Sequence, residues 1–207
     1  MAGEQDLAAR WDDAYAQGDV TRSWFQAAPR MSLRMLDAAG VAAADSVIDV
    51  GGGASSLAGA LLERGFRDVT VLDISAAGLQ RARQRLGPRA GQVQWLTADV
   101  CTWPPTRRFA AWHDRAVFHF LTAGPDRRGY LRALTAATVV SAVAVFGCFA
   151  LDGPRQCSGL PVARYGPREL ADELGRDWTL IADDREDHAT PAGLTQPFTW
   201  AALRRNR

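Results

Sequence analysis

Residues 47–56, VIDVGGGASS, constrain the fold of this chain more than any other part of the sequence. Strand-forming residues surround Asp49, three glycines follow, and Leu57 and Leu61 begin a helix at i, i+4 spacing. Glycines let the backbone turn tightly and approach a ligand closely. The stretch therefore predicts a strand, a glycine-rich turn and a helix, with a ligand beside the turn.

The acidic residue before the glycines indicates which charge the ligand carries. A turn of this kind presents backbone N–H groups and the N-terminus of a helix to the ligand. Asp49 adds a carboxylate, which repels a pyrophosphate and attracts an ammonium or a sulfonium. The pattern favours S-adenosylmethionine over the competing cofactor NAD, whose GxGxxG fingerprint would need a glycine where this chain has Ser56.

The composition is that of one globular domain without a general affinity for polyanions. A length of 207 residues and a hydrophobic content of 47% suit a single domain with a sizeable core. Because 24 basic residues balance 23 acidic ones, we expect no nucleic-acid partner and no membrane partner. All the basic residues are arginines, so the chain has no lysine for Schiff-base chemistry or for a P-loop.

The cysteines indicate a reducing compartment. Cys101, Cys148 and Cys157 are odd in number and lack CxxC spacing, which argues against a disulfide framework and against a metal site. The first residues carry charges instead of an apolar signal core, and the apolar run 139–151 is too short to cross a bilayer. We therefore expect a cytoplasmic protein that binds no metal.

Strand and helix patterns alternate after the glycine turn, which predicts a parallel sheet. We expect helices at 57–64, 76–86, 125–137 and 167–174, and strands at 69–73, 93–96, 109–113 and within 139–149. Two β-like segments, 178–182 and 198–203, predict a hairpin at the sheet edge, with a solvated acidic run at 183–187 between them. The expected fold class is α/β, a Rossmann-like doubly wound sheet that is mostly parallel and has an antiparallel terminal hairpin.

Acidic residues at the strand ends extend the predicted site, since ligands of parallel sheets bind beyond the carboxyl ends of the strands. Asp73 ends one strand 20 residues after Gly53, and suits a carboxylate that accepts hydrogen bonds from two ribose hydroxyls. Asp99 follows the next strand and could accept from an adenine amino group, with the N–H of Val100 beside it. Either residue alone is equally well explained as a helix N-cap, but together with Asp49 they indicate a cofactor site.

These residues resemble the core of the class I S-adenosylmethionine-dependent methyltransferases. Their first motif, an acidic residue followed by alternating glycines, corresponds to Asp49, Gly51 and Gly53, with Ser55 in place of a third glycine. Three further segments resemble a bacterial branch of that family and, more distantly, eukaryotic elongation-factor lysine methyltransferases: Trp11-x-x-x-Tyr15, Ser23-Trp24-Phe25-Gln26 and WHDRAVFHF at 112–120. The resemblance implies seven strands in one domain, 1–207, with a helical cap at 1–40 and an α/β core at 45–207.

The resemblance also implies roles for individual residues. The implied cofactor contacts are Trp11, Tyr15 and Trp24 as a cover, Gly51 near the methionine part, Asp49 and Gly53 in the same motif, Asp73 with Ile74 at the ribose, Asp99 with Val100 at the adenine, and Arg115 after the fourth strand. Two features of the family are missing. Residues 137–141 replace a common Pro-Gly-Gly turn, and no Asn-Pro-Pro-aromatic motif follows the fourth strand, which argues against nucleobase and amide nitrogens as acceptors.

Methyl transfer from a sulfonium requires mainly that donor and acceptor be aligned and water excluded. A base is needed only where the acceptor arrives protonated, and His113 or His119 could serve, although a structural role suits each of them as well. We expect Phe118, Arg164 and Tyr165 to contact the acceptor, with Arg164 suited to an anion; the latter two are equally well explained as ordinary surface residues.

The sequence therefore predicts a methyltransferase that acts on a small-molecule acceptor, with S-adenosylmethionine as cofactor. A protein-lysine methyltransferase is an alternative that rests on the distant eukaryotic likeness, and a protein acceptor thus stays open. A third possibility is a regulator that binds the cofactor without catalysis. A small-molecule enzyme should close its pocket over the methyl group, whereas a lysine methyltransferase needs an open channel.

Overall fold

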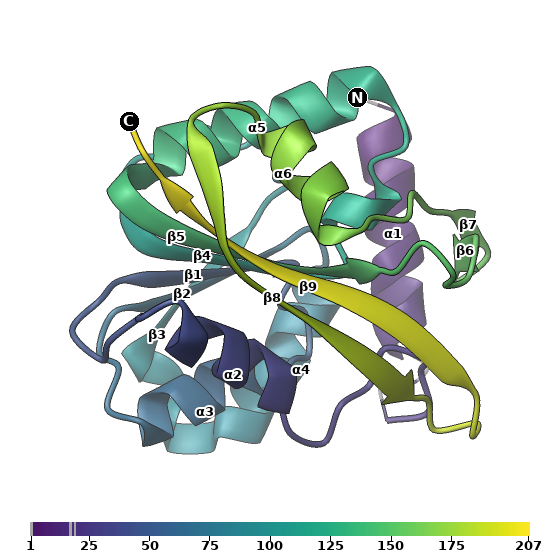
Figure 1. Cartoon of the computed structure of the whole chain (residues 1–207). Coiled ribbons are helices and arrows are strands. Elements are labelled where there is room, and N and C mark those ends of the chain that lie inside the picture. Colours follow the sequence, from purple (N-terminus) through teal and green to yellow (C-terminus); the bar gives the residue numbers. More distant parts are fainter. Residues whose placement is uncertain (1, 17, 19) are drawn as a thin grey trace.

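The computed structural model describes residues 2–16, 18 and 20–207, and its centre is a seven-stranded sheet between two layers of helices (Figure 1). The strands lie in the order β3-β2-β1-β4-β5-β9-β8. Their bounds are β1 Val47–Val50, β2 Val69–Asp73, β3 Val93–Thr97, β4 Phe109–Arg115, β5 Thr138–Phe149, β8 Trp178–Ala189 and β9 Thr195–Arg205. The first five strands are parallel and β9 is antiparallel to both β5 and β8, which confirms the predicted fold class.

Helices cover both faces of the sheet. In Figure 1, α2, α3 and α4 lie on one face and α5 and α6 on the other, while α1 stands beside the sheet near β6 and β7. The helices are α1 Ala2–Ala16, α2 Arg30–Ala38, α3 Leu57–Glu63, α4 Ala76–Leu86, α5 Gly124–Ala137 and α6 Pro167–Leu174, with 3-10 turns η1 Gly87–Gln92 and η2 Phe118–Phe120. Part of the cap expected at 1–40, namely residues 1, 17 and 19, lies outside the described residues. Of the helices described, none is long and apolar enough to cross a membrane.

The core is divided between the two faces because alternate strand residues point in opposite directions. Val47 and Ala111 pack with residues of α2 and α3, whereas Ile48 and Trp112 pack with residues of α5. Both faces of the central strands are therefore covered. A ligand can reach the sheet at the carboxyl ends of the strands.

The terminal hairpin is longer than the sequence predicts. The acidic run 183–187 belongs to β8, where exposed and partly buried side chains alternate as expected at a sheet edge. Pro197 is accommodated in β9 because pairing with β5 ends at Phe198, so the missing N–H of Pro197 removes no bond on that side.

The connection between β5 and α6 contains a short hairpin of β6 Gln156–Cys157 and β7 Leu160–Pro161, which the sequence pattern does not predict. Its two turn residues, Ser158 and Gly159, have φ of +51° and +74°, as a tight hairpin turn requires. α5 ends at Ala137 and passes directly into β5, which begins at Thr138.

Candidate functional site

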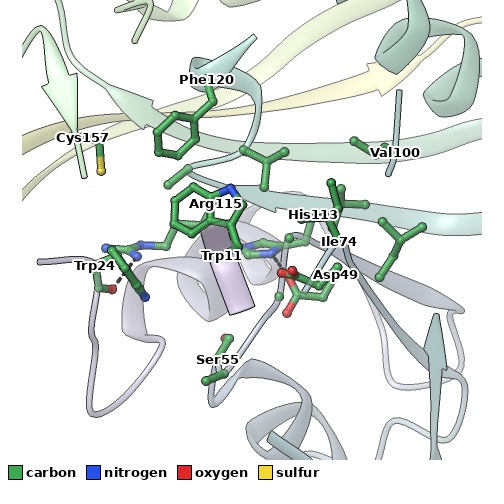
Figure 2. A pocket seen from close by; sticks show the side chains of 18 of the residues that line it. Trp11, Trp24, Asp49, Ser55, Ile74, Val100, His113, Arg115, Phe120 and Cys157 are labelled. Atoms are coloured by element: carbon green, nitrogen blue, oxygen red, sulfur yellow. Dashed lines mark hydrogen bonds and ion pairs between the residues drawn. The ribbon is translucent and has the colours of Figure 1, made fainter. Parts of the chain in front are cut away.

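A cavity of about 670 Å³ opens at the carboxyl ends of β1, β2, β3 and β4, a volume typical of small-molecule sites (Figure 2). Its wall is contributed by α1, residues 24–32, the glycine turn, the ends of β2 and β3, the segment after β4 and the β6–β7 hairpin. Figure 2 shows Trp24, Phe120 and Cys157 on one side, which we call the apolar end. Asp49, Ile74 and Val100 lie on the opposite side, which we call the polar end.

The glycine turn closes tightly against its neighbours. Gly51 and Gly53 have φ of +65° and +43°, which favours glycine at both positions. A Cβ on Gly51 would collide with the side chain of Val117, and one on Gly53 would collide with the hydroxyl of Tyr15. Gly51 lines the cavity directly, whereas Gly53 lies beneath Tyr15 and is not part of the wall.

Asp49 pairs with a histidine that sequence reasoning did not connect to it. The register of β1 against β4 sets Asp49 opposite His113, and Asp49 Oδ1 lies 2.8 Å from His113 Nδ1. Both side chains are only 3% exposed. Because a carboxylate only accepts, Nδ1 carries the proton and Nε2 is left as an acceptor in the neutral ring. Within the described residues, neither Asp49 Oδ2 nor His113 Nε2 has a hydrogen-bond partner.

Asp73 ends β2 and presents a buried carboxyl to the cavity. Its Oδ1 accepts a hydrogen bond of 2.7 Å from the N–H of Ser75, at the start of α4. Burial raises the pKa of Asp73 to about 7, although the N–H groups of Ser75 and Gly53 oppose the increase. A ligand that donates hydrogen bonds to this carboxyl would stabilise its charged form.

Asp99 and Val100 follow β3 and line the same polar end. Asp99 Oδ1 accepts from the N–H of Cys101 at 2.8 Å, and its carbonyl accepts from the N–H of Trp103 at 2.8 Å. These bonds form a local turn and hold the segment in place. Ile74 follows Asp73 and also lines the cavity.

Helix α1 covers the cavity with aromatic side chains. Trp11 and Tyr15 both line it, and Trp11 packs edge-on against Trp24 and Phe120, with ring centroids 5.7 and 5.3 Å apart. At the apolar end, Arg10 donates a hydrogen bond of 2.5 Å to the carbonyl of Ser158 in the β6–β7 turn. The helix is thus attached to the wall opposite the glycine turn.

Arg115 is the last residue of β4 and lines the cavity, and only part of its guanidinium is hydrogen-bonded. Its Nη1 donates to the carbonyl of Trp24 at 2.9 Å, and its charge lies 4.8 Å from the ring centre of Phe198. Burial lowers the pKa of Arg115 to about 10, while the charge of Glu186 opposes that change. Its Nε and Nη2 are inaccessible to solvent and make no hydrogen bond to any described residue.

His119 lies outside the cavity wall, contrary to its expected catalytic role. The ring is fully buried beside Phe120 and Phe149, and its Nδ1 accepts from the N–H of Phe149 at 3.3 Å. Burial, together with the charge of Arg115, lowers the pKa of His119 to about 3. A neutral, sealed ring cannot exchange a proton with a substrate.

The three expected acceptor contacts also lie outside the wall. Phe118 and Tyr165 are buried in the core cluster on the α5 side, where their ring centroids lie 5.5 Å apart, and the N–H of Phe118 donates to the Asp114 carboxylate at 3.1 Å. Arg164 donates to the carbonyl of Gly153 at 3.2 Å. Leu160 and Pro161 line the cavity instead, and no sequence signal identified them.

Comparison with known proteins places this fold in context. Residues 47–139 match the family model of a methyltransferase domain. A search of curated proteins found no significant match.

The solved structures that resemble the chain include the following three. The first is a structure described under the conversion of a disulfide bond into a thioacetal group during echinomycin biosynthesis. It is 22% identical to this chain with a TM-score of 0.77, and the match covers 97% of this chain and 92% of that one. The Burkholderia thailandensis 1,6-didemethyltoxoflavin-N1-methyltransferase, bound to 1,6-didemethyltoxoflavin and S-adenosylhomocysteine, is 21% identical (TM-score 0.69, coverage 97% and 88%). The N-methyltransferase NodS from Bradyrhizobium japonicum WM9, in complex with S-adenosylhomocysteine, is 16% identical (TM-score 0.67, coverage 86% and 87%). All three share the fold of this chain.

Proposed function

We propose that this chain is a class I methyltransferase, which transfers the methyl group of S-adenosylmethionine to a nucleophilic atom of a small-molecule acceptor; the match of residues 47–139 to a methyltransferase domain supports this. One observation carries the proposal: a single cavity beyond the strand ends is lined by Asp49, Asp73 and Arg115, whose buried polar atoms suit an ammonium, a pair of hydroxyls and a carboxylate. S-adenosylmethionine carries all of these groups. The residues present therefore fit this cofactor.

The cofactor contacts follow from this fit and from the family resemblance. We propose that Asp73 with Ile74 holds the ribose and that Asp99 with Val100 holds the adenine. The remaining contacts are Asp49, Gly51 and Arg115 around the methionine part, and Trp11, Tyr15 and Trp24 as the cover. Gly53, expected from the sequence to contact the cofactor, lies beneath Tyr15 and supports that cover instead. Asp73 is the strongest of these assignments, because its buried carboxyl gains most from two donated hydrogen bonds.

The chain's own residues would mainly align the reactants and exclude water. When bound, S-adenosylmethionine supplies a methyl group that its sulfonium has already activated. Trp11, Trp24 and Phe120 form an aromatic wall, which keeps water from the apolar end and fits a flat acceptor against the cofactor. Proximity of this kind can account for much of the rate acceleration of a displacement reaction.

A small-molecule acceptor is favoured over a protein lysine by the chemistry of the apolar end. Trp24, Phe120, Cys157 and Leu160 line this end, and none of them is a carboxylate that would attract a lysine ammonium. Burial raises the pKa of Cys157, so its thiol is not a base at neutral pH. The Burkholderia relative, which binds 1,6-didemethyltoxoflavin, supports the same reading.

Two measurements test the proposal. Isothermal titration should show binding of S-adenosylhomocysteine and none of NAD; the opposite result would overturn it. The protein is then incubated with radiolabelled S-adenosylmethionine and a cell extract, and ultrafiltration separates small molecules from protein. Label in the small-molecule fraction is expected, label in protein would favour the lysine methyltransferase, and binding without any turnover would favour the regulator. The Asp73→Asn variant serves as the control with a damaged cofactor site.

A further inference from the structure

The segment 23–26, SWFQ, is attached to the edge strand β8 at two points. Gln26 Nε2 donates a hydrogen bond of 2.7 Å to Glu186 Oε1, and His188 Nε2 donates one of 2.8 Å to the carbonyl of Ser23. Glu186 and His188 are two residues apart on β8, so both face the same side of the sheet. The strand therefore fixes both ends of a segment that the sequence identified, although Gln26 has no role in the proposed function.

Gln26 places an amide in an aromatic part of the cavity. It lines the cavity directly after Trp24 and Phe25, and Trp24 marks the apolar end in Figure 2. Aromatic side chains select a flat molecule, whereas a small number of fixed polar groups decides which way round it binds. Gln26 can therefore orient an acceptor that stacks against the aromatic wall.

Glu186 determines which atom of the Gln26 amide faces the ligand. Its second oxygen, Oε2, accepts from Trp200 Nε1 at 2.9 Å, and an indole nitrogen only donates. Glu186 thus accepts with both oxygens, so the Gln26 atom that faces it is the NH2 nitrogen. The amide oxygen lies on the other side of the amide carbon, and none of the hydrogen bonds among the described residues ends on it. Since Gln26 lines the cavity, this oxygen is left for a ligand.

We infer that Oε1 of Gln26 accepts a hydrogen bond from an N–H or O–H group at the edge of a flat methyl acceptor. The inference rests on the proposed function and deepens it, because it names a chemical feature that the acceptor carries. Gln26 is then a specificity-determining residue. Glu186 does not line the cavity and is the positioning residue of Gln26.

This arrangement discriminates between acceptors of the same shape. A ring N–H donates to Oε1, whereas a ring oxygen in the same place sets lone pairs against each other and leaves both atoms unpaired. A site built to bind a donor rejects the analogue that lacks it more strongly than an apolar pocket rejects a small change of size. The expected acceptor class is therefore a planar nitrogen heterocycle or a phenol whose N–H or O–H is unsubstituted.

Two probes of equal shape test the inference: benzimidazole, which has a ring N–H, and benzoxazole, in which an oxygen replaces that N–H. Isothermal titration measures the affinity of each probe for the full chain saturated with S-adenosylhomocysteine. The parent should bind benzimidazole roughly 5- to 10-fold more tightly than benzoxazole, as expected for one neutral hydrogen bond. Gln26→Leu should lose this preference and keep the parent's affinity for S-adenosylhomocysteine.

The variant Glu186→Gln separates hydrogen bonding from packing, because it leaves every lining side chain in place. Trp200 Nε1 still needs an acceptor, so the oxygen of the new amide faces Trp200 and its NH2 faces Gln26. Gln26 must then turn its own oxygen towards position 186 and its NH2 towards the cavity. The preference should be reversed, with benzoxazole bound at least as tightly as benzimidazole.

The outcomes separate this inference from the proposed function. Equal binding of the two probes by the parent, or binding of neither, overturns the inference while the proposed function stands. An unchanged preference in Gln26→Leu or in Glu186→Gln also overturns it, since Oε1 would then not contact the probe. If the parent does not bind S-adenosylhomocysteine, the proposed function fails and the inference fails with it. Glu186→Gln carries the test alone if Gln26→Leu does not fold.

Discussion

The carboxylate of Asp12 accepts a hydrogen bond of 2.6 Å from the hydroxyl of Ser75, the N-cap of α4. The same carboxylate oxygen accepts from the N–H of Ala77 at 3.0 Å. Ser75 also accepts from the N–H of Gly78, so α4 keeps a cap of its own. The contact therefore serves to attach α1, which carries Trp11 and Tyr15, over the cavity.

Asp12→Ala should release α1 from this attachment and leave the sheet intact. We expect a several-fold loss of affinity for S-adenosylhomocysteine, because the bonds that Asp12 makes are each worth about 1 kcal/mol. Faster hydrogen exchange in α1, with unchanged exchange in β1 and β4, would show where the change acts. Asp12→Asn keeps an acceptor oxygen and is the matched control. Equal exchange rates in parent and Asp12→Ala would contradict this role of Asp12.

Asp73→Asn should stabilise the ligand-free protein at alkaline pH while it weakens cofactor binding. The pKa of Asp73 is about 7 in the folded chain against 3.8 ordinarily, so the folded state retains a proton that the unfolded state has lost between these values. The free energy of unfolding therefore falls as the pH rises from about 4 to about 7, because the folded state binds more protons there than the unfolded state. Above about pH 7 the carboxyl is ionised in both states, and its effect on the free energy of unfolding is constant. At pH 8 the gain in the variant should be on the order of 1–3 kcal/mol, and it should vanish near pH 4. Urea denaturation at both pH values measures it, and a variant that is less stable at pH 8 would contradict it.

Cofactor binding should itself depend on the protonation of Asp73. Two ribose hydroxyls that donate to the carboxylate favour its charged form, so the pKa of Asp73 falls on binding. Affinity should then rise with pH up to about 7 and become constant above it, with proton release on binding below that value. Titration of S-adenosylhomocysteine in buffers of different ionisation enthalpy detects the released proton. The absence of proton release at pH 6 would remove Asp73 from the ribose site.

Much of the fold could be predicted because the central strands are buried on both faces. A continuous apolar run such as that of β2 carries a strong local signal, and its predicted bounds, 69–73, are those observed. At the sheet edge the signal fails. The acidic residues 183–187 look like a loop in sequence, and only their pairing with β9 makes them a strand.

The site was predictable where it follows strand ends and unpredictable where it depends on register. Asp49, Asp73 and Asp99 line the expected cavity. The bond between Asp49 and His113 joins residues 64 apart in sequence, and nothing local encodes that distance. Phe118 and Phe120 are two residues apart, yet only Phe120 reaches the cavity, because the 3-10 turn η2 directs the two side chains differently.

His119→Asn should leave catalysis unchanged and reduce the acid sensitivity of the fold. The pKa of His119 is about 3 in the folded chain against 6.5 ordinarily, so stability from this group is complete above 6.5 and is lost as pH falls towards 3. Asn removes the titration and can still accept the Phe149 N–H. Thermal unfolding between pH 4 and 7 should show a shallower decline than in the parent. A large drop in kcat would return His119 to the list of catalytic candidates.

Gly53→Ala should damage the cofactor site beyond the cost of backbone strain. The residue has φ of +43°, and an added Cβ would collide with the hydroxyl of Tyr15 on α1. Gly40→Ala is the matched control, because Gly40 has φ of +79° and a Cβ there would meet nothing within 4 Å. Both substitutions should cost about 1 kcal/mol of stability for the positive φ. Only Gly53→Ala should also displace Tyr15 and lower the affinity for S-adenosylhomocysteine. The double variant Gly53→Ala/Tyr15→Phe lacks the colliding oxygen and should regain part of that affinity. Equal ligand affinities for the two alanine variants would show that Tyr15 does not cover the cofactor through Gly53.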